Sequence, residues 1–399
     1  MNRFLVTSLV IGIVAGCSGS GLAASQRPGA PDVTIAPSVA VTQRATPTAT
    51  IRPTPFPTEA FAALSNDPVP ADVAVKFQAA LADAARGGGM AATVMTTAGT
   101  WSGAVGKADG VNDMQPDSQF GIGSGTKPII AAQVMQLVEA GEISLDAPAS
   151  EYLPADFTFD TNGATIRQLL GHRSGIPDWY PAMKERFAAD RLRVWELDEI
   201  LALVPSARRP VGSFEYTDTN FNLLGLVIEH VRQQPLVEVL RNGVLRVEGT
   251  KRLIWQPDEE PTDPMAMPLG ESRDALEQGG GYLPSRSDTI DGAAGGMASD
   301  SISLARWWQA FCAGEIVSET SLTEMSTLIG DVDDEYGLGL FNPAGGYAQG
   351  VGHMGANFGY SSWSACLPQD QLIVVVLRNF EDDGIFELGR PLVMAARPE

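Results

Sequence analysis

A loop leads into a long apolar helix at the stretch Phe120-Gly-Ile-Gly-Ser124-Gly-Thr-Lys127-Pro128. If Ser124 begins that helix, Lys127 lies one turn later on the same face, because residues three apart are neighbours on a helix surface. This spacing places an amine beside a hydroxyl, which becomes a useful nucleophile only when a neighbour takes its proton. The amide groups of a helix N-terminus also favour a developing oxyanion. Alone, a Ser-x-x-Lys pair is a weak signal, so its meaning depends on partners later in the chain.

The balance of charges is strongly acidic. The chain has 399 residues, with 27 lysines and arginines against 48 aspartates and glutamates, which gives a net charge of −21. Nucleic acids and anionic lipids both bind basic surfaces, so we expect neither as a partner of the folded part. We interpret the acidity as a solvated surface that favours solubility.

The N-terminus has the features of a processing signal. A short positive start at Asn2-Arg3 precedes an apolar run that is too short for a membrane span of ~20 residues. The run ends in Val14-Ala15-Gly16-Cys17, which resembles a bacterial lipobox and implies removal of residues 1–16 and lipidation of Cys17. We therefore expect an exported lipoprotein, anchored in a membrane on the extracytoplasmic side of the cell envelope. The alternative is an ordinary secretory signal with an incidental cysteine.

The next segment, residues 17–60, is expected to be a tether. It is rich in Gly and Ser at first and then in Pro and Thr, and it has no periodic apolar face. Proline favours an extended, semi-rigid spacer. Residues 61–399 are expected to form one domain, whose folded part starts near Asp67.

Apolar periodicity predicts helices and strands in a particular order. The expected helices are 70–86, 124–140, a short helix starting at Thr165, 218–233, 300–313 and 384–396. The expected strands are 90–96, 101–105, 336–341, 360–367 and 372–377. Residues 142–250 read as mostly helical, and 249–293 as a long loop rich in Pro, Gly and acids.

This order predicts an α+β fold: one sheet made from both chain ends with helices packed on it, plus a helical subdomain at about 124–300. The apolar run 372–377 is typical of a strand covered on both faces. We expect an active site in the cleft between the sheet and the helical subdomain.

Two later stretches supply partners for the first one. They are Phe214-Glu-Tyr216-Thr-Asp218 and Gly352-His353-Met354-Gly355-Ala356. Together with Ser124 and Lys127 they resemble the three motifs of the penicillin-recognising serine hydrolases, in the branch of class C β-lactamases, D-alanyl-D-alanine carboxypeptidases and related esterases. The stretches 137–146, 166–175 and 295–300 also fit that family, and the resemblance covers about 68–398. It implies the β-lactamase/transpeptidase-like fold, with an antiparallel sheet flanked by helices.

The resemblance also implies roles. Ser124 would be acylated, Lys127 would hold the proton network beneath it, and Tyr216 would act as general base and acid. The N–H groups of Ser124 and Ala356 would form the oxyanion hole. Free Tyr and Lys have pKa values of about 10 and about 10.4, and either can be lowered by its neighbours, so the sequence leaves open which of the two is the base.

Three further residues have expected roles, and two of them lie in the third motif. His353 would complete the polar cluster and favour the Tyr216 anion when it is protonated. Gly355 would let a substrate approach the strand closely. His172 is expected to be structural, as a hydrogen-bonding residue at a helix end.

The sequence also departs from the family pattern. The second motif usually ends in Asn, but here it ends in Asp218, and Asn220 would point elsewhere on a helix. Met354 and Ala356 occupy places where relatives carry hydroxyl groups that bind a substrate carboxylate. Because an anionic Asp218 would repel such a carboxylate and hold Lys127 protonated, we expect neutral esters or amides to be preferred.

The function expected is hydrolysis of an amide or ester through an acyl-enzyme, on a small-molecule or peptidoglycan-derived substrate. The alternative is a sensor module that acylates slowly or not at all. No Gly-x-Ser-x-Gly elbow and no His-Glu-x-x-His motif occurs in the chain, whose three histidines are scattered. We expect no metal and no cofactor. Cys312 and Cys366 could pair, but we expect each to be a separate buried apolar side chain.

Overall fold

The computed structural model describes residues 55–399, apart from 86–87, 190–192, 257, 263, 269–290, 331–334, 358, 381–383 and 398–399. The expected signal peptide, the lipidation of Cys17 and nearly all of the expected tether therefore lie outside the described residues. Among the described helices, none combines the length and the apolarity that crossing a membrane requires.

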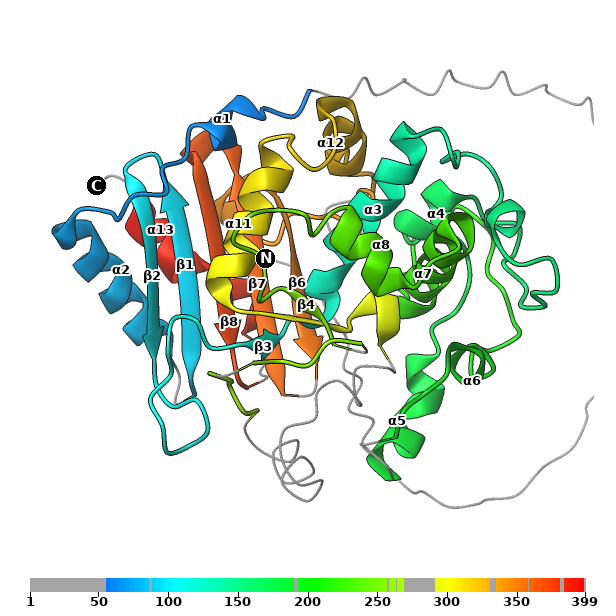
Figure 1. The fold of residues 1–399 in the computed structure, drawn as a ribbon, viewed down its shortest axis with the longest axis horizontal. Helices are drawn as coiled ribbons and strands as arrows, with labels where there is room; N and C mark the ends of the chain where they lie inside the picture. Colours follow the sequence, from blue (N-terminus) through cyan, green and yellow to red (C-terminus); the bar gives the residue numbers. More distant parts are fainter. Residues whose placement is uncertain are drawn as a thin grey trace, which may run out of the picture. The chain divides into compact units, whose positions relative to one another are not determined.

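The central sheet joins the two ends of the folded chain, as predicted (Figure 1). Its five antiparallel strands stand in the order β2-β1-β8-β7-β6. They are β1 (Met90–Thr96), β2 (Gly99–Val105), β6 (Val351–Asn357), β7 (Tyr360–Leu367) and β8 (Leu372–Arg378). A smaller sheet pairs β3 (Phe120–Gly121) and β4 (Ile254–Trp255) with β5 (Met297–Ser299). The predicted α+β architecture is confirmed.

Helices cover both faces of the central sheet. One face packs against α11 (Ser301–Cys312), and the other against α2 (Ala71–Ala84) and α13 (Arg390–Ala396). Along β8, Ile373, Val375 and Leu377 join the first core cluster, whereas the residues between them join the second. Because both faces are buried, this strand is apolar without interruption.

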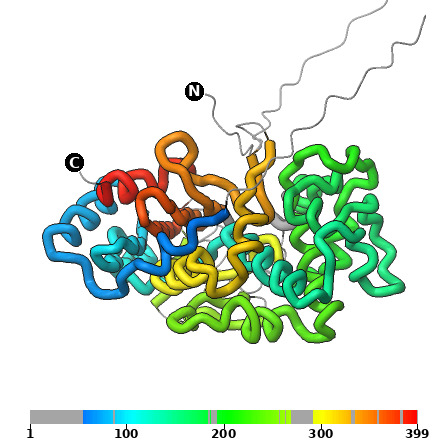
Figure 2. Tube along the Cα trace, turned by 90° about the horizontal axis from the view of Figure 1, so that it is seen from above, coloured from blue at the N-terminus to red at the C-terminus, as the bar shows by residue number. Residues whose placement is uncertain are grey.

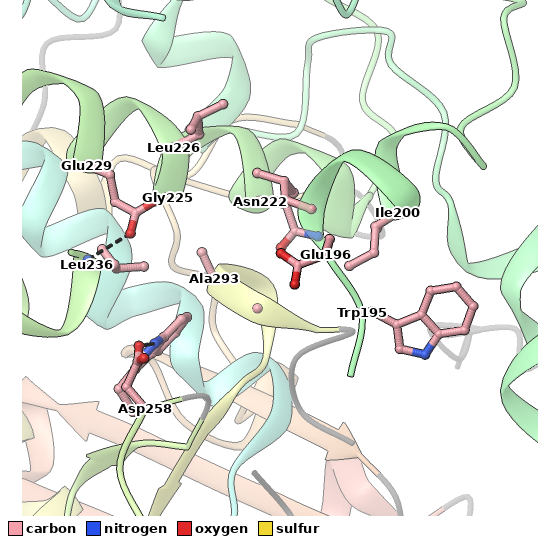
Figure 3. Close-up of a pocket in the computed structure, with 13 residues that line it drawn as sticks. Trp195, Glu196, Ile200, Asn222, Gly225, Leu226, Glu229, Leu236, Asp258 and Ala293 are labelled. Carbon is pink, nitrogen blue, oxygen red and sulfur yellow. Dashed lines mark hydrogen bonds between the residues drawn. The ribbon is translucent and has the colours of Figure 1, made fainter. Parts of the chain in front are cut away.

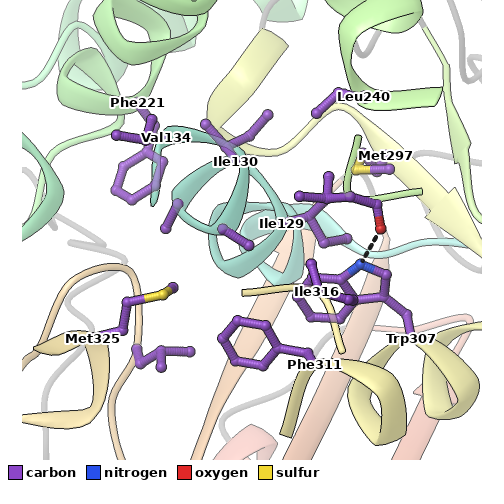
Figure 4. Packing of buried hydrophobic residues seen from close by; sticks show 14 of the residues in the cluster. Ile129, Ile130, Val134, Phe221, Leu240, Met297, Trp307, Phe311, Ile316 and Met325 are labelled. Atoms are coloured by element: carbon purple, nitrogen blue, oxygen red, sulfur yellow. Dashed lines mark hydrogen bonds between the residues drawn. The ribbon is translucent and has the colours of Figure 1, made fainter. Parts of the chain in front are cut away.

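The first core cluster also fixes the helix that follows Ser124. Helix α3 (Lys127–Glu139) buries Ile129 and Ile130 in this cluster, and Ile129 lies beside Trp307 of α11 (Figure 4). Trp307 of α11 is fully buried and donates a hydrogen bond of 3.0 Å from Nε1 to the carbonyl oxygen of Val244. Full burial of a large apolar side chain stabilises a fold by roughly 1.5–3 kcal/mol, so Ile129 and Ile130, both fully buried, anchor α3 in the core.

The remaining helices form the predicted helical region, drawn in green beside the sheet in Figure 2. They are α4 (Ile166–Leu170), α5 (Tyr180–Ala189), α6 (Leu197–Leu201), α7 (Asp218–Arg232) and α8 (Leu236–Asn242). Thr165 caps α4, because its side chain accepts a hydrogen bond from the backbone N–H of Gln168. Helix α12 (Glu319–Ser326) follows α11.

Several expectations are wrong at the level of local structure. The folded part starts before Asp67: helix α1 (Glu59–Ala62) is formed, and Phe56 and Phe61 are buried in the first core cluster. Residues 336–341 are not a strand and make only isolated bridges at their two ends. The last helix begins at Arg390 rather than at 384, after a short 3-10 turn (Ile385–Glu387). Much of the expected loop 249–293 lies outside the described residues.

The two cysteines of the folded part are also not separate. Both Cys312, at the end of α11, and Cys366, in β7, are fully buried, and a disulfide joins them. The burial of these side chains was predicted, but the expectation of two free thiols was wrong. Sequence carries no information on the distance between residues that are 54 positions apart.

Candidate active site

Ser124 and Lys127 meet where a 3-10 turn passes into α3. Ser124 lies in the turn (Gly123–Thr126), and Lys127 is the first residue of the helix. The amine Nζ of Lys127 donates a hydrogen bond of 2.9 Å to Oγ of Ser124. Lys127 is fully buried and Ser124 is half-buried, so the hydroxyl stands between a buried amine and the solvent.

Lys127 has three hydrogen-bond partners. Besides Ser124 Oγ, its Nζ contacts Oδ1 of Asp218 at 2.6 Å and the carbonyl oxygen of Ala294 at 2.7 Å. These three acceptors match the three hydrogens of an ammonium group. A buried charge is tolerated only when it is paired and hydrogen-bonded, and this arrangement meets both conditions.

Tyr216 approaches the same hydroxyl from the segment that precedes α7. The centre of its ring lies 5.0 Å from Nζ of Lys127. Burial of the phenol and the carboxylate of Asp218 raise the pKa of Tyr216 well above its usual value, and a hydrogen bond with Ser124 opposes this rise. One part of the ring remains open to solvent, with 39% of the residue exposed. At neutral pH Tyr216 is therefore an uncharged phenol that bonds to Ser124 and is partly exposed to solvent.

Strand β6 lies directly against the serine turn. A β-carbon at Gly355 would lie 2.0 Å from the carbonyl oxygen of Ile122 and 2.8 Å from the backbone nitrogen of Ser124. The glycine is thus required for packing of the turn, and the expectation that it lets a substrate approach the strand closely stays a prediction. Ala356 is exposed, and its backbone nitrogen would lie 3.0 Å from a β-carbon at Gly123. Both amides expected for the oxyanion hole therefore come from the contact between β6 and the turn.

His353 is buried and uncharged. Its Nδ1 lies 2.6 Å from the carbonyl oxygen of Met354, which can only accept, so Nδ1 carries the hydrogen. Its Nε2 then accepts a hydrogen bond of 3.0 Å from the hydroxyl of Tyr336. Burial and the charge of Lys127 lower the pKa of His353 to about 3. The expected support of the Tyr216 anion requires a protonated His353, and the lowered pKa leaves this ring uncharged at neutral pH.

Tyr336 was not recognised in the sequence as part of the site. It is buried, and its ring lies 4.8 Å from that of His172, which in turn lies 4.2 Å from the ring of Tyr216. His172 accepts a hydrogen bond of 3.3 Å at Nδ1 from the backbone N–H of Thr217. These aromatic contacts hold the loop that carries Tyr216. The interpretation of residues 336–341 as a strand concealed Tyr336.

A second carboxylate, Asp178, was also missed. Its Oδ1 accepts a hydrogen bond of 3.3 Å from the backbone N–H of Tyr180, and a further bond comes from the backbone N–H of Asp218. Burial and the nearby charge of Asp218 raise the pKa of Asp178 to about 7. Nothing in the sequence around Asp178, which lies between Pro177 and Trp179, predicts a place in the site, because its partner Asp218 comes 40 residues later in the chain.

The other motif residues point away from Ser124. Asn220 is fully buried and accepts a hydrogen bond of 2.6 Å at Oδ1 from Oγ of Ser174, as its place on α7 predicted. Met354 is buried in the core cluster on the opposite face of the sheet. Neither side chain offers a group for a substrate carboxylate. Among the described residues, no group of three or more His, Cys, Asp or Glu side chains is placed to hold a metal ion.

Known proteins share this arrangement of elements. The family model named Beta-lactamase matches residues 75–396. A protein of Bacillus subtilis named as a penicillin-binding protein, PbpX, is 26% identical over 67% of this chain and 64% of its own length. Esterase EstB of Burkholderia gladioli is 35% identical over 31% of this chain and 35% of its own. The matches thus span less than two thirds of either relative.

One of the solved structures is similar over nearly its whole length. The D-stereospecific amidohydrolase from a Streptomyces species is 25% identical, with a TM-score of 0.65 over 79% of this chain and 98% of that one. Since the family model covers most of the folded part, the chain belongs to the β-lactamase family of proteins.

Proposed function

We propose that the protein is a serine hydrolase that forms an acyl-enzyme on Ser124 with an ester or an uncharged amide. The observation that carries this proposal is the 2.9 Å contact between Lys127 Nζ and Ser124 Oγ, with the phenol of Tyr216 bonded to the same hydroxyl. A serine held by a buried amine, at the start of a helix and beside the amide of Ala356, has the parts that acyl transfer requires.

The three acceptors around Lys127 fit its ammonium form, so Lys127 takes the Ser124 proton only after it has released one of its own. The carboxylate of Asp218 and the carbonyl of Ala294 can only accept hydrogen bonds. When the amine is uncharged, its two hydrogens serve those acceptors and its lone pair faces Ser124. Tyr216 is held protonated by burial and by Asp218, which raise its pKa, so it is poised to give a proton rather than to take one.

The proposed steps balance in protons and bonds. The Ser124 oxygen forms a bond with the substrate carbonyl carbon, its proton passes to uncharged Lys127, and the carbonyl electron pair becomes an oxyanion near the amides of Ser124 and Ala356. The tetrahedral intermediate then breaks its bond to the leaving group, which takes the proton of Tyr216. Lys127 returns a proton to Tyr216. Water cleaves the acyl-enzyme by the same route in reverse.

The negative charges around Ser124 indicate which class of substrate is preferred. Asp218 is the first residue of α7, Asp178 accepts a hydrogen bond from its backbone N–H, and the carboxylates of Asp178 and Asp291 both raise the pKa of Tyr216. No hydroxyl side chain stands at Met354 or Ala356 to bind a carboxylate. A substrate carboxylate would be repelled, so we infer that uncharged or positively charged substrates are preferred. The similarity to a D-stereospecific amidohydrolase makes amino-acid amides reasonable candidates beside esters.

The test compares kcat/KM for three chromogenic substrates: a p-nitrophenyl ester, a D-amino-acid p-nitroanilide with its L-enantiomer, and a cephalosporin that carries a carboxylate. We expect the ester or the anilide to be turned over fastest, and Ser124→Ala to abolish turnover and the acyl adduct seen by mass spectrometry. Faster turnover of the cephalosporin would reject the substrate class. A persistent adduct without turnover would instead support a sensor module.

We also propose that the protein is exported and held at the cell envelope by a lipid on Cys17. The support is the sequence Val14-Ala15-Gly16-Cys17 after a short apolar run. Metabolic labelling with a fatty acid should mark the full-length protein and fail to mark Cys17→Ala. Equal labelling of the two proteins would contradict this proposal.

A further inference from the structure

A cavity of about 270 Å³ lies in the helical region beside the candidate active site (Figure 3). One wall is the side of α7 that carries Asn222, one turn beyond Asp218, and another is formed by Gly292 and Ala293. Ser124, Lys127, Tyr216 and Asp218 do not line it. Its volume is close to the lower end of the ~300–1,000 Å³ that is usual for small-molecule sites.

An unpaired amide faces this cavity. Asn222 is only 3% exposed, and neither Nδ2 nor Oδ1 of its side chain has a hydrogen-bond partner among the described residues. Its neighbours on α7, Phe221 and Leu223, are fully buried apolar residues. A buried polar group without a partner costs about 1–3 kcal/mol. The amide oxygen of Asn222 is therefore an available acceptor for a ligand that donates hydrogen bonds.

The charge of the lining selects the kind of ligand. Glu196, Glu229 and Asp258 line the cavity, whereas no Lys, Arg or His among the described residues does. Burial and the charge of Asp258 raise the pKa of Glu229, even though its Oε1 accepts a hydrogen bond of 2.8 Å from the backbone N–H of Leu236. Uncompensated negative charge in a partly enclosed space attracts a cation.

The cavity is too apolar for a bare metal ion. Trp195, Trp255, Ile200 and Leu226 also line it. A hydrogen bond of 3.0 Å from Nε1 of Trp255 to Oδ2 of Asp258 fixes the indole ring beside a carboxylate. An indole next to an acid is suited to an organic ammonium ion, because the ring face attracts the charge and the ring body packs against carbon.

We propose that this cavity binds a small organic cation, namely a primary ammonium group on a short apolar body. The ammonium donates hydrogen bonds to Oδ1 of Asn222 and to the carboxylates of Glu229 and Asp258, and the apolar body packs against Trp255 and Leu226. The site is separate from Ser124, so this binding goes beyond the proposed hydrolysis. The nearest link between the two is the backbone from Ala293 to Ala294, whose carbonyl binds Lys127.

The probe is 2-phenylethylammonium, with uncharged 2-phenylethanol as its matched control, and binding is measured by isothermal titration calorimetry on the full folded chain. We expect saturable binding of the ammonium ion to the wild type and to Ser124→Ala alike. Binding to Ser124→Ala separates this site from the hydrolytic one, so loss of hydrolysis would leave the result intact. Equal binding of the alcohol, or no binding of the ammonium ion to the wild type, would overturn the proposal.

Two variants test the location of the site, and a third variant serves as the control. Glu229→Gln removes a charge but keeps an oxygen for the N–H of Leu236, and Asn222→Leu removes the amide. Each should weaken binding by about tenfold or more, which corresponds to about 1.4 kcal/mol. Glu238→Gln makes the same charge change on an exposed position of α8 and should have no effect. Equal weakening by Glu238→Gln and Glu229→Gln would show a general charge effect and reject the site, even if Asn222→Leu failed to fold.

Discussion

The two sides of the candidate active site differ in how they use polar groups. On one side Lys127 donates to Ser124, Asp218 and Ala294, and the hydroxyl at the centre remains half-buried. On the other side His353 and Tyr336 bond to each other in a sealed, uncharged pair, with 2% and 4% of their surfaces exposed. Charge is therefore concentrated where the proposed mechanism moves a proton, whereas the other side is uncharged.

This contrast has a physical origin in the hydrogen-bond capacity of each group. Both nitrogens of His353 are engaged, by Tyr336 and by the carbonyl of Met354, so none is left for Ser124 or Tyr216. Lys127 in contrast has two partners that cannot give a proton and one that can. We call Lys127 and its three partners the lysine side, and the pair of His353 and Tyr336 the histidine side. Variants on the two sides should behave differently.

The largest effect is expected on the lysine side. Lys127→Met keeps the volume of the buried side chain but removes the group that takes the Ser124 proton, so kcat/KM should fall by roughly a thousandfold to ten-thousandfold. The measurement is ester hydrolysis under single-turnover conditions, with circular dichroism as the folding control. Retention of more than a tenth of the wild-type rate would remove Lys127 from the proposed mechanism.

A somewhat smaller effect is expected for Tyr216→Phe. The ring still packs on His172, 4.2 Å away, but the proton for the leaving group is lost. We expect kcat/KM to fall by roughly a hundredfold to a thousandfold. The loss should be larger for an anilide than for a p-nitrophenyl ester, whose leaving group needs no proton. Equal losses for the two substrates would contradict the assignment of Tyr216 as the acid.

On the histidine side we expect a loss of stability rather than of activity. Tyr336→Phe leaves Nε2 of His353 buried without its donor, which should cost about 1–3 kcal/mol in the free energy of unfolding. The value of kcat/KM should change less than tenfold. Because burial and Lys127 lower the pKa of His353 to about 3, its titration should add no step to the pH profile between 5 and 8 in either protein. A step there that Tyr336→Phe displaces would show that His353 carries charge in catalysis.

The sequence predicted best what depends on neighbouring residues. The strands Met90–Thr96 and Tyr360–Leu367 lie where the sequence predicted them, because apolar patterning and flanking turns are local features. The contact between Lys127 and Ser124 follows from helical spacing alone. Tyr216 was singled out only by its resemblance to a family motif, since nothing local indicates that it meets a serine 92 positions earlier.

The features that could not be predicted depend on contacts between residues far apart in the chain, or occur where the local composition favours a different structure. Asp178 looks like an ordinary loop acid until the fold places it at the first turn of α7. Tyr336 and Phe341 favour a strand by side-chain type, but both pack on the ring of His353 instead. Phe56 lies in a proline-rich stretch that resembles a tether, yet it is buried against Phe61. In each case tertiary packing overrode the local pattern.

The smallest effect, and the one that tests the acidic character of the lysine side, is expected for Asp178→Asn. Burial and Asp218 raise the pKa of Asp178 from 3.8 to about 7. Between pH 3.8 and about 7, Asp178 is protonated in the folded protein but ionised in the unfolded chain. The free energy of unfolding therefore falls as pH rises through this range. Asparagine mimics the protonated acid. The melting temperature of the variant should therefore exceed that of the wild type by more at pH 8 than at pH 5, whereas exposed Asp156→Asn should show no such trend.

The same titration should appear in substrate choice. Above pH 7 the ionised Asp178 adds a second negative charge beside Asp218. A quaternary ammonium ester carries a charge that does not titrate, and an uncharged ester of the same acid and similar size is its control. The ratio of their kcat/KM values should rise about threefold from pH 6 to pH 8 in the wild type, as a partly screened charge pair would give, and stay flat in Asp178→Asn. A rise of equal size in the variant would show that the preference for cations arises elsewhere than at the start of α7.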